Sequence, residues 1–339
     1  MVQLINSFLL KITLVILVFI GMTSCEKDKQ VNSNAYSASC EPCAKIPPNI
    51  SSQPRQIKET SFQRLAPCFN PLNGNEFIYL KQDSSFNTSL VKCNLITKNE
   101  TTILTGQRIV CQPKWGKNGW IVFAALNLQI YKVKQNGDSL TQLTNLYMNS
   151  YPDITSDGKI MSNITGGESY RPCLVFFDFN GKRLDSVKFS TINNNFLNPA
   201  VINYNNEIAA SNQSNIVLFN RNNNLLELLT NDTGTNQRYL SSVCWHSNGN
   251  DIYYSSWVMG DNNSDFVGIC RLNKNSKENV LIKNACNSRS YSSLSISPDG
   301  KKIIAERQDY QLMSDNNLLK NSDICIMDID GRNEEKVFK

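Results

Sequence analysis

The sequence predicts an all-β protein: a six-bladed β-propeller in which each blade is a four-stranded antiparallel sheet. One unit recurs six times along the chain, an apolar strand followed by a tight turn rich in Asp, Asn and Gly and then by a second apolar strand. The recurrences are 39 to 51 residues apart, a spacing typical of propeller blades. Asn makes up roughly one residue in eight, which favours turns over helices because its side chain competes with helical backbone bonds.

The clearest unit covers residues 293–305, where an apolar strand enters a Ser-Pro-Asp-Gly turn and a second apolar strand leaves it. Glycine and asparagine adopt the positive φ values that such two-residue turns need. The six turns are marked by Gly74, Gly119, Gly158, Asn205, Gly249 and Gly300. We therefore expect one blade at each of these six positions, in the order of the sequence.

Each unit also has a second half. A third apolar strand ends in a polar turn, as in residues 324–331 and 130–137, and a short fourth strand follows, as in residues 140–144 and 225–230. Four strands in about 45 residues, repeated radially, form a propeller blade. Residues 64–339 are thus expected to form the whole propeller.

Residues 296–304 and 326–331 resemble the repeat of the TolB-like, WD-type β-propeller family, which reads apolar-Ser-Pro-Asp-Gly-Lys-Lys-apolar and then Met-Asp-apolar-Asp-Gly. The resemblance covers about four fifths of the chain, closely in the last blade and in outline in the other five. It implies the fold and a binding surface, but no particular activity.

The first 24 residues have the layout of a bacterial lipoprotein signal peptide, with Lys11, an apolar run and then Met22-Thr-Ser-Cys25. A transmembrane anchor is the alternative, but the apolar run is short for one. We therefore expect a lipid on Cys25, a flexible tether over residues 25–63, and a place in the bacterial cell envelope, at the outer membrane or the periplasmic side.

Composition argues against several functions. With 34 basic and 29 acidic side chains, the charge is too balanced for a nucleic-acid partner. The single histidine, His246, excludes sites that need two imidazoles, and it takes the turn position that Ser297 has in the last blade. The chain also has no Gly-x-Ser-x-Gly motif. The sequence thus predicts a non-enzyme without catalytic residues, metal or cofactor.

Ten cysteines follow Cys25. Cys68 and Cys244 occupy one repeat position on first strands, while Cys93 and Cys270 occupy another on third strands, too far apart within a blade for disulfides. Most of these thiols are therefore expected to be small buried hydrophobes. For Cys40 and Cys43 in the tether, a disulfide is the expectation in an oxidising compartment.

A binding site is expected on the face of the longer connections, where blades five and six have long segments at residues 255–266 and 307–320. Three arginines recur seven residues before the landmark position of their blades, and converging guanidinium groups would bind a carboxylate, a phosphate or an acidic glycan. In the alternative, each arginine pairs with a nearby carboxylate or faces solvent. The candidate ligand-binding residues are Arg108, Arg238, Arg289, Tyr239, Tyr291, Trp257 and Tyr310.

Together these features predict a membrane-anchored propeller that binds an envelope protein or a glycan. Two alternatives remain open: a propeller hydrolase or lyase that acts on polysaccharide, and a structural spacer in an envelope assembly.

Overall fold

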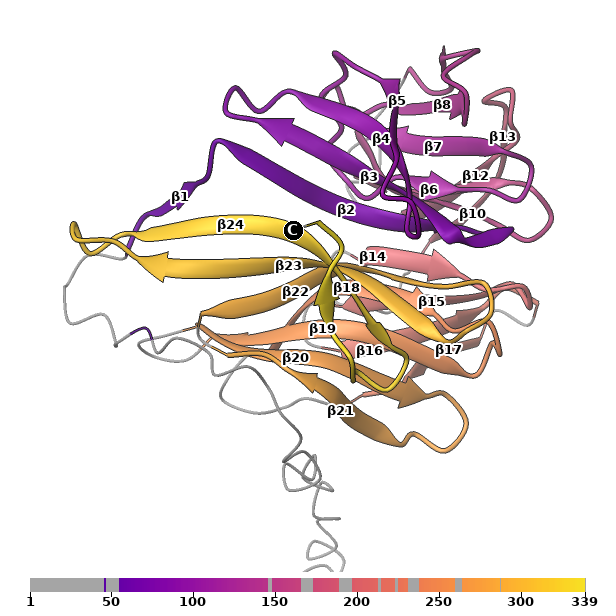
Figure 1. Ribbon diagram of the computed structural model, residues 1–339. Helices are drawn as coiled ribbons and strands as arrows, with labels where there is room; N and C mark the ends of the chain where they lie inside the picture. Colours follow the sequence, from indigo (N-terminus) through magenta and orange to yellow (C-terminus); the bar gives the residue numbers. More distant parts are fainter. Residues whose placement is uncertain are drawn as a thin grey trace, which may run out of the picture. The chain divides into compact units, whose positions relative to one another are not determined.

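The computed structural model describes residues 46, 55–145, 148–165, 173–188, 197–212, 215–222, 225–230, 238–259, 264–286 and 288–338. These residues form an all-β structure of six sheets arranged as a six-bladed propeller, as predicted (Figure 1). No helix long and apolar enough to cross a membrane occurs in this part of the chain. Residues 1–24, which are expected to form a signal peptide, and Cys25, Cys40 and Cys43 lie outside the described residues.

Each blade is formed by consecutive strands that pair in sequence order, innermost first. Blade one contains β2 (Phe62–Asn70), β3 (Asn73–Asp83), β4 (Thr88–Asn94) and β5 (Glu100–Leu104). Blade two contains β6 (Lys114–Trp115), β7 (Trp120–Ala124), β8 (Ile130–Lys134) and β9 (Thr141–Gln142). Blade three contains β10 (Met148–Ile154), β11 (Ile160–Thr165), β12 (Cys173–Phe177) and β13 (Arg183–Lys188).

The second half of the chain repeats this plan. Blade four contains β14 (Leu197–Ile202), β15 (Glu207–Asn212), β16 (Asn215–Asn220) and β17 (Leu225–Leu228). Blade five contains β18 (Arg238–Trp245), β19 (Asp251–Met259), β20 (Ser264–Asn273) and β21 (Asn279–Asn284). Blade six contains β22 (Arg289–Ile296), β23 (Lys302–Leu312), β24 (Leu318–Asp328) and β25 (Glu335–Lys336).

Blade six also takes up a strand from the start of the propeller. β1 (Ile57–Glu59) pairs in parallel with the first part of β24, while β25 pairs with its last part. Figure 1 shows β1 alongside the beginning of β24. Both ends of the described chain therefore share the outer edge of one blade, and strand pairing begins before residue 64, the expected start of the propeller.

The core lies between blades. Six clusters of buried apolar side chains each join two neighbouring blades, and the cluster between blades one and six completes the circle. Because both faces of a middle strand are covered, its sequence reads as a continuous apolar run, as in Phe77–Leu80 and Ile121–Ala124. The ring is therefore closed by the same packing that joins any two blades.

The predicted turns are confirmed in four blades and corrected in two. Gly300 has a φ of 73°, and its N–H donates to the Ser297 carbonyl oxygen at 2.9 Å. In blade four the residue with positive φ is Asn206, not Asn205, because Asn206 donates the matching bond to Asn203. In blade one Gly74 lies inside β3, since the turn there is formed by the two residues between Asn70 and Asn73.

The long connections of blades five and six are largely strand. In blade six, β23 and β24 pair without interruption from Lys302 to Leu312, and the turn is confined to the next five residues. β19 and β20 also extend up to Met259 and from Ser264, with one register shift between Ser256 and Trp257. A hairpin satisfies the backbone groups that an irregular loop would leave to water.

Candidate functional site

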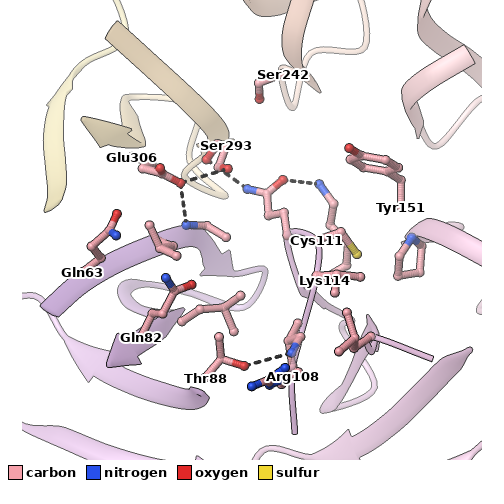
Figure 2. A pocket seen from close by; sticks show the side chains of 18 of the residues that line it. Gln63, Gln82, Thr88, Arg108, Cys111, Lys114, Tyr151, Ser242, Ser293 and Glu306 are labelled. Carbon is pink, nitrogen blue, oxygen red and sulfur yellow. Dashed lines mark hydrogen bonds between the residues drawn. The ribbon is translucent and has the colours of Figure 1, made fainter. Parts of the chain in front are cut away.

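A cavity of about 500 Å³ opens at the centre of the propeller on the face of the long connections. It is lined by residues of all six blades, and Figure 2 shows the polar side chains that face it. The predicted face therefore contains a pocket of the size that small ligands occupy.

Backbone irregularities shape the wall of this cavity. The innermost strands β2, β10, β14, β18 and β22 each carry a β-bulge where they reach it. Ala66, Tyr151 and Ser293 adopt positive φ at three of these bulges, with values of 55°, 47° and 51°, and all three line the cavity. Bulges and strained φ values concentrate near functional sites because they redirect the chain.

A bulge frees backbone N–H groups, and side chains of the preceding blade accept some of them. The Ser242 hydroxyl of blade five accepts the N–H of Leu294 in blade six at 2.8 Å. The Glu306 carboxylate of blade six accepts the N–H of Ala66 in blade one at 3.2 Å. Adjacent blades are thus joined at the cavity wall by side chain to backbone bonds.

One wall of the cavity is rich in acceptors. Glu306 is 6% exposed and Gln63 is 2% exposed, and both face the cavity (Figure 2). Glu59 lies beside them and is neutralised by Lys320, whose Nζ is 2.6 Å from its carboxylate. Burial alone would raise the pKa of Glu59, but the bonds from Lys320 and Gln63 lower it below its ordinary value.

The start of β6 and the segment before it supply two basic groups, Lys114 and Arg108. The Lys114 Nζ donates to Gln112 Oε1 at 2.8 Å, and the Gln112 amide donates to the carbonyl oxygens of Pro67 and Ser293. Arg108 is exposed at the rim, where it donates to the Ser85 carbonyl oxygen at 3.4 Å. Gln112 therefore holds the Lys114 ammonium at the centre of the propeller.

A second cavity, of about 490 Å³, opens on the opposite face among the tight turns, and Lys114 lines both cavities. Asp153 lies in this second cavity, where its carboxylate accepts the backbone N–H groups of Ile154 and Ile202, each at 2.9 Å. Burial raises the pKa of Asp153, although the nearby Lys114 charge and these two bonds oppose the shift.

His246 is a turn residue, as the repeat predicts. Its Nδ1 accepts the N–H of Asn248 at 3.1 Å, and its Nε2 is 3.0 Å from the Gly300 carbonyl oxygen. The ring therefore carries its proton on Nε2 and donates it to the turn of the next blade. A β-carbon at position 300 would lie 2.7 Å from this Nε2, so glycine is needed there for contact as well as for φ.

Of the predicted binding residues, Arg108 lines the cavity on the long-connection face. Arg289 forms an ion pair with Asp309 at 2.9 Å, Tyr291 is buried and donates to Glu334 at 2.9 Å, and neither lines the cavity. The side chains of Arg238, Tyr239 and Trp257 lie outside the described residues, so the arginine ring as a whole stays a prediction.

The side chains of Tyr310 and Arg64 also have partners within the protein. Tyr310, the last of the candidate binding residues, is half-buried, and its hydroxyl donates to Gln308 Oε1 at 3.0 Å. Arg64 pairs with Asp323 at 3.4 Å and lies over the Phe338 ring, 4.1 Å from its centroid. Arg64, like Arg289, therefore pairs with a carboxylate of its own chain, which is the alternative stated above for the recurring arginines.

Sequence reasoning missed Glu306, Gln63 and Lys114. Glu306 follows the buried run Ile303–Ala305, and a charge that directly extends a buried strand is the signal that could have revealed it. Gln63 belongs to the segment assigned to the tether. Lys114 directly precedes the landmark Trp115, at the start of an innermost strand.

Seven cysteines of the described chain are free thiols, and six of them are buried, as expected for most. Cys286 is disulfide-bonded, with a partner outside the described residues. No group of three or more His, Cys, Asp or Glu side chains in the described part of the chain could hold a metal ion.

Comparisons with known proteins support the fold alone. No family model and no curated protein sequence matches the chain. Among solved structures, TolB from Acinetobacter baumannii is similar, with a TM-score of 0.55, 14% identity, and coverage of 80% of this chain and 62% of that one. Oligogalacturonate lyase in complex with manganese gives a TM-score of 0.53 at 12% identity, over 81% of this chain and 77% of that one. A puromycin-hydrolyzing peptidase of Mycobacterium tuberculosis gives 0.52 at 7% identity, over 81% and 52%.

These neighbours include enzymes as well as TolB, and every identity is too low to transfer an activity. The chain therefore has a TolB-like β-propeller fold.

Proposed function

We propose that the protein is a non-catalytic binding protein of the bacterial cell envelope. A lipid on Cys25 holds it to the membrane, and the propeller takes up its ligand in the cavity on the long-connection face. The lipobox-like sequence Met22–Cys25 supports the anchor. An envelope protein or a glycan would reach the cavity from the open rim, which exposes Phe86 and Leu126 beside Arg108.

The observation that carries this proposal is the composition of the cavity wall. Carboxylate, amide, ammonium and guanidinium groups converge on one space of about 500 Å³, and several of them are held by neutral partners rather than by opposite charges. A wall with polar groups at fixed positions is what recognition of a polar ligand requires. A rigid spacer in an assembly would need no such wall.

A ligand screen tests the proposal. The full-length protein in detergent is heated with anions, oligosaccharides, amino acids and short peptides, and its melting temperature is recorded. We expect at least one compound class to stabilise the wild type, because a ligand that binds only the folded state raises its stability.

Arg108→Ala should reduce that stabilisation, and Arg332→Ala is the matched control because Arg332 is an exposed arginine on a turn far from this cavity. No stabilising compound, or equal stabilisation of both variants, would contradict the proposal. Recovery of a cleaved compound would support the polysaccharide hydrolase or lyase instead.

The anchor is tested separately by growing cells with a labelled fatty acid. Label should be found on the wild type and on Cys40→Ala, but it should be absent from Cys25→Ala. Label on Cys25→Ala would show that the protein is not anchored through that thiol.

A further inference from the structure

The Glu306 carboxylate is buried at the cavity wall without a counter-charge. Its partners are Ala66 N–H at 3.2 Å, Gln308 Nε2 at 2.7 Å and Ser293 Oγ at 3.5 Å, all of them neutral donors. No lysine or arginine among the described residues lies within ion-pair distance of it. A buried charge without a paired cation is costly for the fold.

The fold does not need that charge. At the adjacent interface, the Ser242 hydroxyl accepts the bulge N–H of Leu294, the same task that Glu306 performs for Ala66. A neutral group is therefore sufficient to join two blades at a bulge, and the inter-blade bond does not account for a carboxylate at position 306.

A second acceptor on the same wall has no partner at all. Gln63 is 2% exposed and lines the cavity, and its Nε2 donates to Glu59 at 2.7 Å. Its Oε1 has no hydrogen-bond partner, although buried amide oxygens are normally bonded. Figure 2 shows Gln63 and Glu306 on the same side of the cavity, and their strands β2 and β23 are in contact. This wall therefore has an acceptor, Gln63 Oε1, without a donor. Because the neighbouring Glu306 is negatively charged, a positively charged donor would suit it best.

The basic groups of the cavity, Lys114 and Arg108, also lack a partner of opposite charge among the described residues. Lys114 donates to the Gln112 amide oxygen and Arg108 to the Ser85 carbonyl oxygen. In the part of the chain that the structure describes, neither has a carboxylate within ion-pair distance. One cavity thus contains a negative group and two positive groups that are held apart instead of neutralising one another.

We propose that the cavity binds a small zwitterion, an amino acid or a short peptide. Its ammonium group donates to the Glu306 carboxylate and Gln63 Oε1, and its carboxylate faces Lys114 and Arg108. This inference rests on the proposed function and names the ligand class of the same site. A simple anion would be repelled by the Glu306 carboxylate. A neutral sugar would leave the negative charge of Glu306 and the positive charges of Lys114 and Arg108 without partners.

Binding measurements with capped ligands test the inference without altering the protein. Free amino acids and alanyl dipeptides are titrated calorimetrically into the full-length protein in detergent, beside their N-acetylated and C-amidated forms. At least one free compound should bind, and either cap should weaken it about tenfold or more, because each removes a charge-assisted hydrogen bond. Equal affinity of free and capped forms would overturn the inference.

Two variants assign the ends of the ligand. Glu306→Gln should weaken the free peptide about tenfold yet leave the weak binding of the N-acetylated form unchanged. Arg108→Gln should weaken the free form but not the C-amidated one, and it alters only an exposed side chain, so folding is not at risk. Arg332→Gln is the control, with unchanged affinity.

The same titrations separate this inference from the proposed function. Binding of oligosaccharides or simple anions with no binding of zwitterions would reject the inference but keep the binding protein. No binding of any class would reject both.

Discussion

Glu334 shows how single residues connect the last blade to its neighbour. Its side chain is 8% exposed and accepts bonds from Lys283 of β21 at 2.6 Å, Arg307 of β23 at 3.0 Å and Tyr291 of β22 at 2.9 Å. Burial alone would raise the pKa of Glu334, but Lys283, Arg307 and Tyr291 together hold it below its ordinary value. Its ionised form therefore stabilises the folded protein.

Glu334→Gln should lower the free energy of unfolding by about 3 kcal/mol at pH 7, because it leaves Lys283 without its carboxylate and leaves Arg307 with Asp309 alone. Urea denaturation measures this loss. The control is Glu335→Gln, which alters an exposed side chain of β25 and should change stability by less than about 0.5 kcal/mol.

The stability lost in Glu334→Gln should also depend on pH. Because the native pKa of Glu334 is lowered, its contribution is complete above the unfolded value of about 4.3 and is lost as the pH falls through the native value. The difference between wild type and Glu334→Gln should therefore narrow between about pH 5 and pH 3. A constant difference over that interval would show that the charge of Glu334 is not the source of the stability.

At the scale of elements, the short strand β1 completes blade six. The Thr60 N–H donates to the Lys320 carbonyl oxygen at 3.0 Å, and the Leu318 N–H donates to the Gln56 carbonyl oxygen at 2.9 Å. Without β1, the outer edge of β24 would present unpaired backbone groups over its first part, and the cavity wall would lose Glu59.

Thr60→Pro should therefore destabilise the propeller by about 1–3 kcal/mol, since proline removes the N–H that bonds Lys320 and leaves a carbonyl group without its partner. Thr60→Ala is the matched variant: it loses only the hydroxyl bonds to Phe62 and Asn321 and should cost less. Thermal unfolding compares the two. Equal melting temperatures would mean that β1 pairing adds no stability.

The sequence predicts the central elements of each blade better than their ends. Strands such as Phe77–Leu80 and turns such as Gly300 carry their own local signals, apolar runs and residues suited to positive φ. β1 has no such signal, because all three of its residues are exposed and its partner β24 is distant in the sequence. The bulges at Ala66 and Tyr151 also escape prediction, since neither residue type favours positive φ.

For the whole molecule, the fold can be predicted from the sequence, but the composition of the site cannot. Six similar units imply a closed ring, and the circle of six inter-blade clusters is the physical result. The cavity instead combines residues that do not repeat: Glu306 in one blade, Gln63 in another and Lys114 in a third. A repeat pattern in the sequence does not show which non-repeating residues come together. Only the three-dimensional structure therefore reveals that their charges share one cavity.

The closed ring also determines how the molecule opens. Cys68, Cys93, Cys111, Cys244, Cys270 and Cys325 lie in five of the six inter-blade clusters. Burial raises the pKa of Cys244 to about 12 and that of Cys93 to about 11, so neither forms a reactive thiolate at neutral pH. In a closed ring no interface can separate without straining the others, and we expect the clusters to open together.

Labelling with a maleimide, followed by peptide mass spectrometry, tests this expectation. Among the seven free thiols of the described chain, Cys173 is the one that is half-buried, and in native buffer it alone of these seven should react within minutes. The other six should become reactive together over a single narrow range of guanidinium concentration, because cooperative unfolding exposes every interface at once. Cys173→Ser should remove the fast reaction and leave the shared transition unchanged. Exposure of the cysteines of one interface at clearly lower denaturant would instead show that this interface opens alone and that ring closure does not couple the blades.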